Sequence, residues 1–234
     1  MIEAILFDFY DTLVYRDETV TAAVRAAVAD LLAVRPDELA ATWRRYRDDR
    51  MLGIIPTLED HLRVVVRDLG RQPPPGAIAA AARLEREGQR RAVRPYPATA
   101  SVLAELRRAG FRLGLLSNSS DTAQEPIWGL GIGQLFDAVV LSHEVGLLKP
   151  DPRIYRLACE RVGALPSECA FVADGGFGEL DAAHDLGMLA IKIEQQGQSK
   201  DYGSSTYCDL CLSDLRDLVA VAAGWRRSRG EGGE

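Results

Sequence analysis

From about residue 99 onward the chain alternates between short apolar runs and amphipathic segments, and this alternation limits its fold more than any other feature. The apolar runs occupy 111–117, 138–141, 169–173 and 189–193, and helix-like stretches occupy 99–109, 152–162 and 180–186. A further apolar run, residues 3–9, opens the chain. Strands that alternate with helices imply crossover connections. The sequence therefore predicts an α/β fold with a Rossmann-like, doubly wound parallel sheet.

The region between the first two strands has a different pattern. It contains amphipathic segments with apolar residues every three or four positions, separated by breaks that contain Pro or Gly, at 19–34, 36–52, 57–70 and 75–91. We predict that residues 15–94 form an inserted all-helical domain. Residues 1–14 and 95–223 would then form the α/β core, and 224–234 a disordered tail.

Composition and charge exclude several functions. The 234 residues are 47% hydrophobic and 26% charged, as is ordinary for a globular protein. The net charge of −6 provides no general field to attract nucleic acid or anionic membrane. No membrane-spanning run or signal peptide is apparent. We expect a cytoplasmic protein that acts on a small molecule, and the oligomeric state cannot be predicted from the sequence.

The four cysteines are too few for a disulfide scaffold in a chain of this length. Cys208 and Cys211 have the spacing of a metal or redox pair, but no second pair lies near them. The surrounding segment resembles a short strand that leads into a helix. We therefore expect structural cysteines, kept reduced in an intracellular setting.

Polar residues follow the apolar runs in a repeated design. They are Asp8 with Thr12, Ser117 with Asn118, Lys149, and Asp174 with Glu179. In a parallel sheet the carboxyl ends of the strands meet along one edge, where ligands bind. The predicted fold would therefore gather a lysine, hydroxyl groups and carboxylates at one place.

The order and form of these segments resemble the haloacid dehalogenase superfamily of hydrolases, from residue 5 to about 218. The helical insert resembles the helical cap of that family. The resemblance implies that Asp8 is the nucleophile and Thr12 the motif I threonine. It also implies that Ser117 is the motif II hydroxyl, Lys149 the motif III lysine, and Asp174 with Glu179 the acidic motif IV.

These roles are chemically consistent. A carboxylate can attack phosphorus or carbon and form a covalent intermediate that water later cleaves. Mg²⁺ and a lysine can neutralise a phosphoryl group so that an anion can approach it. We expect Asp8, the Tyr10 carbonyl, Asp174 and Glu179 to make an oxygen-only Mg²⁺ site. Thr12, Ser117 and backbone N–H groups would hold the phosphate oxygens, and Asn118 is expected to be a substrate-binding residue.

Tyr10 is the main departure from the family pattern. Most phosphatases of the superfamily carry an aspartate at that position, where it protonates the leaving group and then activates water. A phenol with a pKa near 10 is a poor substitute at neutral pH. Tyr10 would therefore be a weak proton donor at best, and the loss of general acid–base help costs about 10²–10⁴-fold.

Tyr10 also resembles motif I of the 2-haloacid dehalogenases, whose halide leaves without a proton. Tyr155, six residues after Lys149, fits that group too, and Arg44 is the best match to an arginine that binds carboxylate or halide. Those dehalogenases are metal-free and replace the first motif IV acid by a small polar residue. This chain retains Asp174, which favours a cation site.

Three functions remain open on the sequence alone. The first is Mg²⁺-dependent hydrolysis of phosphate esters with Asp8 as nucleophile. The second is metal-independent hydrolysis of 2-haloacids, and the third is a non-catalytic homologue that binds a phosphorylated ligand. In each case we expect specificity to come from the helical insert, with Tyr15 and Arg44 among the substrate-binding residues.

Overall fold

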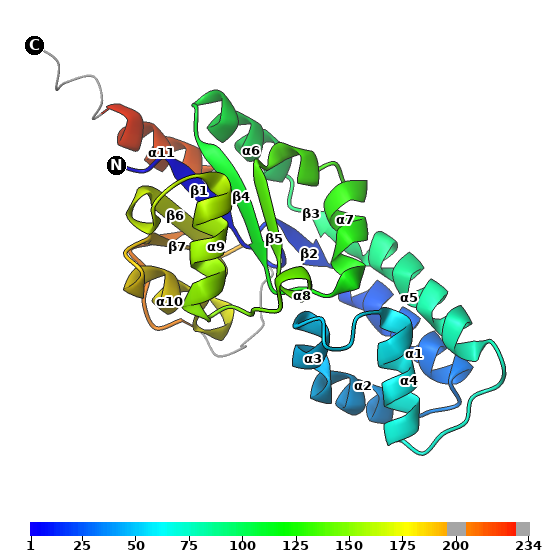
Figure 1. Cartoon of the computed structure of the whole chain (residues 1–234). Coiled ribbons are helices and arrows are strands. Elements are labelled where there is room, and N and C mark those ends of the chain that lie inside the picture. The colour runs from blue at the N-terminus through cyan, green and yellow to red at the C-terminus, as the bar shows by residue number, and fades with distance from the viewer. Residues whose placement is uncertain (196–204, 228–234) are drawn as a thin grey trace, which may run out of the picture.

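The computed structural model describes residues 1–195 and 205–227. Figure 1 shows a sheet with helices on both faces and, to one side of it, a bundle of helices that comprises residues 18–92. We call these helices, α1–α5, the helical unit. The rest of the described chain is the core.

The core sheet has six strands in the described residues, in the order β5-β4-β1-β6-β7-β8. The strands are β1 (Ala4–Phe7), β4 (Arg112–Ser117), β5 (Ala138–Leu141), β6 (Cys169–Ala173), β7 (Leu189–Ile193) and β8 (Leu210–Leu212). Every neighbouring pair is parallel. The predicted parallel α/β fold is therefore confirmed.

Successive side chains of β1 point to opposite faces of the sheet. Ile5 and Phe7 belong to an apolar cluster that includes α6 and α11, whereas Ala4 and Leu6 belong to one that includes α9 and α10. The core helices are α6 (Thr99–Arg108), α7 (Gln124–Gly129), α8 (Ser142–Val145), α9 (Pro152–Val162), α10 (Glu179–Asp185) and α11 (Asp217–Arg227). Short 3₁₀ turns are η1 (Asp121–Ala123), η2 (Gly133–Leu135), η3 (Pro166–Glu168) and η4 (Gly176–Gly178). The sheet is thus covered on both faces.

The helical unit has an apolar core of its own, which includes Val28, Leu39 and Leu62. Its helices are α1 (Glu18–Leu31), α2 (Pro36–Arg45), α3 (Arg47–Met51), α4 (Leu58–Asp68) and α5 (Ala77–Ala92). The amphipathic segment 36–52 contains two helices rather than one. Tyr46 leaves the helical region, with φ −102° and ψ 15°, and splits the segment into α2 and α3.

A two-stranded antiparallel ribbon joins the two parts. It pairs β2 (Val14–Arg16) with β3 (Val93–Pro95). Just beyond it, the Asp17 N–H donates to the Ala92 carbonyl at 2.9 Å. The predicted boundaries at 14/15 and 94/95 fall within this ribbon.

The predicted disordered tail begins too early. α11 continues to Arg227, and Trp225 packs edge-on against Phe111 with ring centroids 5.9 Å apart. This aromatic contact ties the helix to the core, so residues 224–227 are not part of a free tail. Residues 228–234 lie outside the described residues.

The cysteine prediction also needs correction. Cys208 and Cys211 form a disulfide, whereas Cys159 and Cys169 are free and buried. The turn before β8 brings the Cα atoms of Cys208 and Cys211 to 6.4 Å, within the range that a disulfide can bridge. In the described part of the chain, no helix is both long and apolar enough to cross a membrane.

Candidate active site

The strand order places three predicted site residues side by side. Asp8 directly follows β1, Ser117 ends the neighbouring β4, and Asp174 directly follows β6 on the other side of β1. Phe7 lies in register with Leu115 and Val172, so these three strands end almost level. Their polar side chains therefore meet at one edge of the sheet.

Lys149 reaches this edge from the loop before α9. Its Nζ lies 2.5 Å from Asp8 Oδ1 and 2.6 Å from Glu179 Oε2, and the side chain is almost fully buried. Burial alone would lower the pKa of Lys149, but attraction to Asp8 and Glu179 outweighs burial and raises it. The lysine is thus a permanent positive charge between two carboxylates.

Asp8, Asp174 and Glu179 each place a carboxylate oxygen within 4.8 Å of those of the other two. Burial, and then the charge of Asp8, raises the pKa of Asp174. Burial also raises the pKa of Glu179 well above its ordinary value, against the opposing effect of Lys149. Three carboxylates beside one lysine leave two negative charges to be balanced when all are ionised. The cluster is therefore suited to a divalent cation.

The loop from Asp174 to Glu179 is fixed by its own contacts. Glu179 Oε1 accepts a hydrogen bond from Gly175 N at 3.3 Å, and the buried Tyr155 hydroxyl donates to the Glu179 carbonyl at 2.9 Å. The carboxylate oxygens of Glu179 thus have two partners, Gly175 N at Oε1 and Lys149 Nζ at Oε2, whereas Asp174 Oδ1 accepts a longer bond from Gly176 N at 3.4 Å. Asp174 is the more available of the two acids for a metal ion.

The turn after Asp8 holds motif I. Thr12 Oγ1 donates to Asp8 Oδ2 at 3.5 Å, and Thr12 is fully buried. Asp11 has φ 61°, a left-handed conformation that non-glycine residues adopt rarely. The Tyr10 ring packs against Phe9, and the Arg16 guanidinium lies 3.8 Å above its centroid. The tyrosine is therefore held by packing and a cation–π contact.

Motif II contributes hydroxyl groups and a positioning amide. Ser117 is fully buried, and its Oγ has no hydrogen-bond partner among the described residues. Asn118 Nδ2 donates to the Lys149 carbonyl at 2.9 Å, and Lys149 N donates to Asn118 Oδ1 at 2.8 Å. The Asn118 side chain therefore fixes the backbone that carries the lysine, and its role in substrate binding stays a prediction.

The two residues predicted to bind substrate from the insert lie differently. Tyr15 is 39% exposed and stacks on Tyr96 at 5.3 Å. Burial, with the charges of Asp11 and Asp174, raises the pKa of Tyr96 to about 12, so this aromatic pair lies beside the carboxylates. Arg44 is exposed, and no contact among the described residues places it at the site.

A different arginine approaches the site from the helical unit. The Arg47 guanidinium lies 5.0 Å from the ring centroid of Phe177, which sits between Asp174 and Glu179 in the motif IV loop. Phe177 is exposed and has φ 58°. The arginine-rich segment in the sequence pointed to this helix but gave no signal for which arginine contacts the core.

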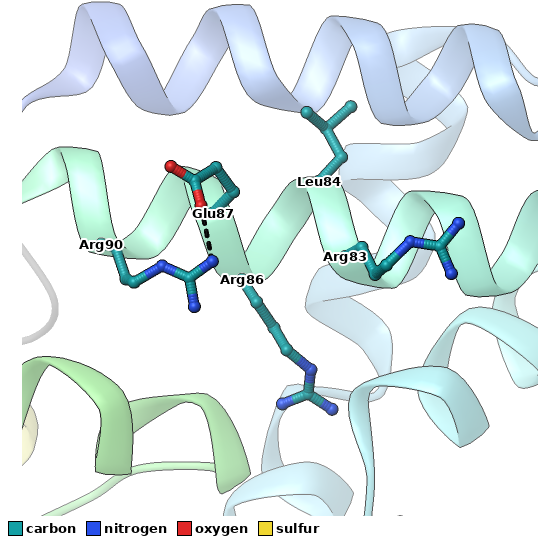
Figure 2. Close-up of a pocket in the computed structure, with 5 residues that line it drawn as sticks. All are labelled: Arg83, Leu84, Arg86, Glu87 and Arg90. Carbon is teal, nitrogen blue, oxygen red and sulfur yellow. Dashed lines mark hydrogen bonds and ion pairs between the residues drawn. The ribbon is translucent and has the colours of Figure 1, made fainter.

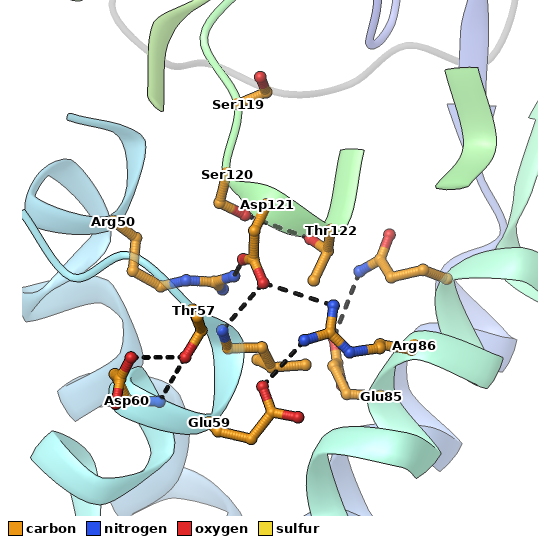
Figure 3. A network of polar contacts seen from close by, with 12 residues as sticks. Arg50, Thr57, Glu59, Asp60, Glu85, Arg86, Ser119, Ser120, Asp121 and Thr122 are labelled. Atoms are coloured by element: carbon orange, nitrogen blue, oxygen red, sulfur yellow. Dashed lines mark hydrogen bonds and ion pairs between the residues drawn. The ribbon is translucent and has the colours of Figure 1, made fainter. Parts of the chain in front are cut away.

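Asp121, just after motif II, was not predicted. Its carboxylate accepts hydrogen bonds from Arg50 Nη2 at 2.6 Å and from Leu58 N at 3.0 Å. Arg86 is 3.4 Å away and also binds Glu59. Figure 3 shows these residues of the helical unit gathered around the 119–122 loop. Asp121 thus anchors the helical unit to the core near the candidate active site.

A cavity of about 510 Å³ lies elsewhere. All its lining residues belong to α5, and Figure 2 shows them along that helix: Arg83, Leu84, Arg86, Glu87 and Arg90. Arg86 and Arg90 already bind carboxylates. None of the predicted site residues lines this cavity, so we do not assign the reaction to it.

The site combines a carboxylate at a strand end with a buried lysine, a second acid and two buried hydroxyl groups. This combination is typical of hydrolases with a parallel α/β sheet that attack their substrate with an aspartate. Comparison with known proteins agrees with this class. The sequence model of the haloacid dehalogenase-like hydrolase family matches residues 2–187. The chain belongs to this family.

Relatives within the family have different substrates. A glyceraldehyde 3-phosphate phosphatase of Methanopyrus kandleri is 29% identical over 86% of this chain and 87% of its own. A phosphoserine phosphatase of Thermus thermophilus is 31% identical over 82% and 77%. An (S)-2-haloacid dehalogenase of Xanthobacter autotrophicus is 27% identical over 91% and 84%. The protein is therefore a hydrolase related to both phosphatases and dehalogenases.

A solved structure supports the fold. The 2-haloacid dehalogenase of Pseudomonas syringae superposes with a TM-score of 0.75 over 96% of this chain and all of its own, at 23% identity. At that identity the likeness concerns the architecture alone. It agrees with the parallel sheet and the helical insert described above.

Proposed function

We propose that the protein is a Mg²⁺-dependent hydrolase of small phosphate monoesters that uses Asp8 as its nucleophile. The charge balance at the sheet edge carries this proposal. Asp8, Asp174 and Glu179 converge on one place, and Lys149 offsets only one of their charges. A divalent cation would offset the other two.

The residues fit Mg²⁺ in their chemistry. Mg²⁺ prefers oxygen ligands and retains several waters, so a few carboxylates suffice. Asp8, Asp174 and the Tyr10 carbonyl would hold it, with Glu179 acting through water. When bound, the ion would neutralise phosphate charge and orient the phosphoryl group.

Asp8 would attack the phosphorus atom with one carboxylate oxygen. The new O–P bond makes an aspartyl phosphate, and the bond between phosphorus and the ester oxygen breaks, so the alcohol leaves and takes up a proton. Water then attacks the acyl phosphate, releases inorganic phosphate and regenerates the Asp8 carboxylate. The positive charge of Lys149 offsets charge on the phosphoryl oxygens, and Thr12 and Ser117 supply hydroxyl donors to them.

Tyr10 sets a limit on this reaction. No acidic side chain occupies the position two residues after Asp8, and the Tyr10 ring is held beneath Arg16. Proton transfer to the leaving group would therefore receive little help. We expect esters with good leaving groups to react much faster than alkyl phosphates.

The test is release of inorganic phosphate from p-nitrophenyl phosphate and from a panel of phosphorylated metabolites. We expect activity that requires Mg²⁺, disappears with a chelator and is lost in Asp8→Asn. Asp30→Asn, which removes an exposed acid on α1, is the matched control and should retain activity. Phosphate release that persists in Asp8→Asn would rule out the proposed nucleophile.

Metal-independent hydrolysis of 2-haloacids is the second candidate, and Tyr10 is the observation that favours it. Halide leaves without a proton, so that reaction does not need an acid at position 10. Retention of Asp174 argues for the phosphatase, since a third carboxylate adds a negative charge that a metal-free site does not need. Halide release from 2-chloropropionate in the presence of chelator, without phosphate release, would establish the second candidate instead.

A further inference from the structure

The motif IV loop is held by a serine from a distant segment. Ser205 N donates to the Gly175 carbonyl at 2.7 Å, and Leu180 N donates to Ser205 Oγ at 3.0 Å. Gly175 directly follows Asp174, and Leu180 directly follows Glu179. One serine is thus bonded to the neighbour of each motif IV acid, so its position affects the geometry of both carboxylates.

Ser205 supplies a cap that the start of α10 lacks. The first N–H groups of a helix have no partner within it, and a Ser, Thr, Asp or Asn side chain at the N-cap usually accepts from one of them. The N-cap of α10 is Gly178, which has no side chain to do so. The Ser205 hydroxyl, 25 positions from Leu180, takes this role. The start of α10 at Glu179 therefore depends on a segment outside the motif.

The residues that follow also bind the core. Thr206 N and Oγ1 donate to the Asp181 carboxylate at 3.0 Å and 2.8 Å. The Tyr207 ring stacks on His184 of α10, with ring centroids 3.9 Å apart. Asp209 Oδ2 accepts from a backbone N–H of β7 at 2.7 Å. The segment is therefore attached both to α10 and to the sheet.

A disulfide closes this segment, residues 205–211, which we call the clamp segment. Cys208 is half-buried against the apolar cluster that includes α9 and α10, and Cys211 is an exposed residue of β8. A disulfide stabilises a fold mainly by restricting the unfolded chain, and more so for long loops, but these cysteines are only 3 positions apart. The bond therefore acts mainly on local structure, by joining the clamp segment to the sheet.

The exposure of Cys211 makes the bridge accessible to thiol exchange. A thiolate of a dithiol reductant attacks Cys211 Sγ, the Sγ–Sγ bond breaks, and Cys208 leaves as a thiolate that takes up a proton. The second thiol of the reductant then displaces Cys211 from the mixed disulfide. The protein gains two thiols, and the reductant becomes a disulfide.

We propose that the clamp segment positions motif IV and that its disulfide makes this positioning depend on redox state. In the oxidised protein, Ser205 holds Asp174 and Glu179 in the arrangement that binds Mg²⁺. Reduction by a dithiol loosens the segment and weakens that binding. Ser205 acts through the backbone of the motif IV loop, so it is a positioning residue. This inference rests on the proposed function for the identity of the metal site.

The first test removes the serine hydroxyl. Ser205→Ala keeps the backbone bond to Gly175, and Mg²⁺ should bind about tenfold more weakly in titration calorimetry, as is usual when a group that orients metal ligands is lost. Ser205→Thr keeps the hydroxyl and should keep the affinity. Ser101→Ala removes an exposed hydroxyl on α6 and should leave the affinity unchanged. At saturating Mg²⁺ the kcat of Ser205→Ala for p-nitrophenyl phosphate should approach that of the wild type.

The second test reduces the disulfide with dithiothreitol. Reduction should weaken Mg²⁺ binding by the wild type by part of that factor, about threefold, because the Thr206 bonds to α10 remain. The double variant Cys208→Ser/Cys211→Ser should bind equally weakly without the reductant and should not respond to it. Cys159 and Cys169 are free in both proteins, so a response through them would persist in the double variant.

Hydrogen exchange gives a readout that needs neither metal nor turnover. In metal-free protein, Ser205→Ala should speed exchange of the Leu180 N–H about fivefold, which corresponds to one lost hydrogen bond. Dithiothreitol should speed the same exchange in the wild type.

Unchanged Mg²⁺ affinity or unchanged Leu180 exchange in Ser205→Ala overturns the positioning role. The redox role is overturned if dithiothreitol has no effect on the wild type, or the same effect on the double cysteine variant. If Mg²⁺ does not bind the wild type at all, the proposed phosphatase is wrong, whereas Leu180 exchange still decides the role of the clamp segment.

Discussion

Two reciprocal hydrogen bonds join the Asn118 side chain to the Lys149 backbone. The asparagine Nδ2 donates to the Lys149 carbonyl at 2.9 Å, and the asparagine Oδ1 accepts from the Lys149 N–H at 2.8 Å. The two residues are 31 positions apart in the sequence, and their hydrogen bonds connect motif II to the lysine of the proposed mechanism. The position of the Lys149 charge next to Asp8 therefore depends on an uncharged side chain.

Replacing Asn118 by alanine should displace Lys149 rather than remove it. A misplacement of about 1 Å can cost about 10²-fold in rate, so we expect kcat for p-nitrophenyl phosphate to fall by roughly that factor. Loss of the two hydrogen bonds should also lower the free energy of unfolding by about 1–3 kcal/mol. Ser120→Ala, in the same loop, leaves the pair intact and should keep nearly full activity. An Asn118→Ala enzyme with unchanged kcat would contradict this role.

Introducing an acid at position 10 should restore the missing proton donor. Tyr10→Asp places a carboxyl group two residues after Asp8, where an acid can protonate the leaving group. General acid–base help is worth about 10²–10⁴-fold, so turnover of an alkyl phosphate should rise by at least 10²-fold. Turnover of p-nitrophenyl phosphate, whose leaving group needs no proton, should change little. Tyr10→Asn is the uncharged control, and an equal gain in both variants would show that size rather than acidity matters.

The Asp121 anchor should contribute strongly to stability. Its partner Arg50 is only 6% exposed, so Asp121→Asn would leave a buried guanidinium without its counter-charge. Breaking such a pair from one side costs about 3–5 kcal/mol. Glu125→Gln breaks an exposed ion pair with Arg90 between the same two parts of the molecule and should cost less than about 1 kcal/mol. Urea unfolding of both variants measures the two losses in the free energy of unfolding. Equal losses would contradict the prediction that the Asp121 ion pair stabilises the protein more than the Glu125 ion pair does.

His61 should make the helical unit sensitive to acid. Burial, with the charges of Arg50 and Arg25, lowers the pKa of His61 from 6.5 to about 3. Between about pH 6.5 and pH 3, the His61 imidazole is therefore protonated in the unfolded chain and neutral in the folded chain. The free energy of unfolding falls as the pH is lowered through this range. At pH 5 the loss amounts to about 2 kcal/mol, at 1.36 kcal/mol per pH unit.

His61→Leu removes this proton from the balance. Between pH 7 and pH 5 the variant should lose about 2 kcal/mol less stability than the wild type, as measured by urea unfolding at both values. Leu62→Ala, on the same helix, destabilises through a cavity without a titrating group, so its deficit should be the same at both pH values. If the free energy of unfolding of the wild type and of His61→Leu fell by the same amount between pH 7 and pH 5, the prediction would be refuted.

The sequence predicted the parts of the site that depend on strand ends. Asp8, Ser117 and Asp174 each follow an apolar run, and parallel strands bring such positions together wherever the crossovers are regular. Lys149 was predicted from the family resemblance, and its 2.5 Å contact with Asp8 agrees with that assignment. The strand and helix bounds at 138–141, 152–162, 169–173 and 189–193 also agree with the structure.

What escaped prediction depends on contacts between distant segments. The Arg47 contact with Phe177 and the Asp121 anchor both involve the docking of the helical unit on the core, and the break at Tyr46 is a local departure from helical backbone angles. Periodicity identifies which face of a helix is apolar but gives no angle between two domains. Arg44 was named from the family resemblance, and no local pattern in the sequence points to the Arg47 contact or distinguishes Asp121 from an ordinary residue at the start of a helix.

The hydrogen bond from Asp17 to Ala92 means that a stretch of about seventy-five residues leaves the core and returns to it at adjacent points. None of the six strands of the core sheet comes from the helical unit, so the strand pairing of the sheet does not depend on it. Changes in the length or number of helices in the helical unit can therefore alter which substrate binds while the side chains at the strand ends keep their positions. A miniature in which a short turn joins residue 16 to residue 93 should still fold around the same strand ends.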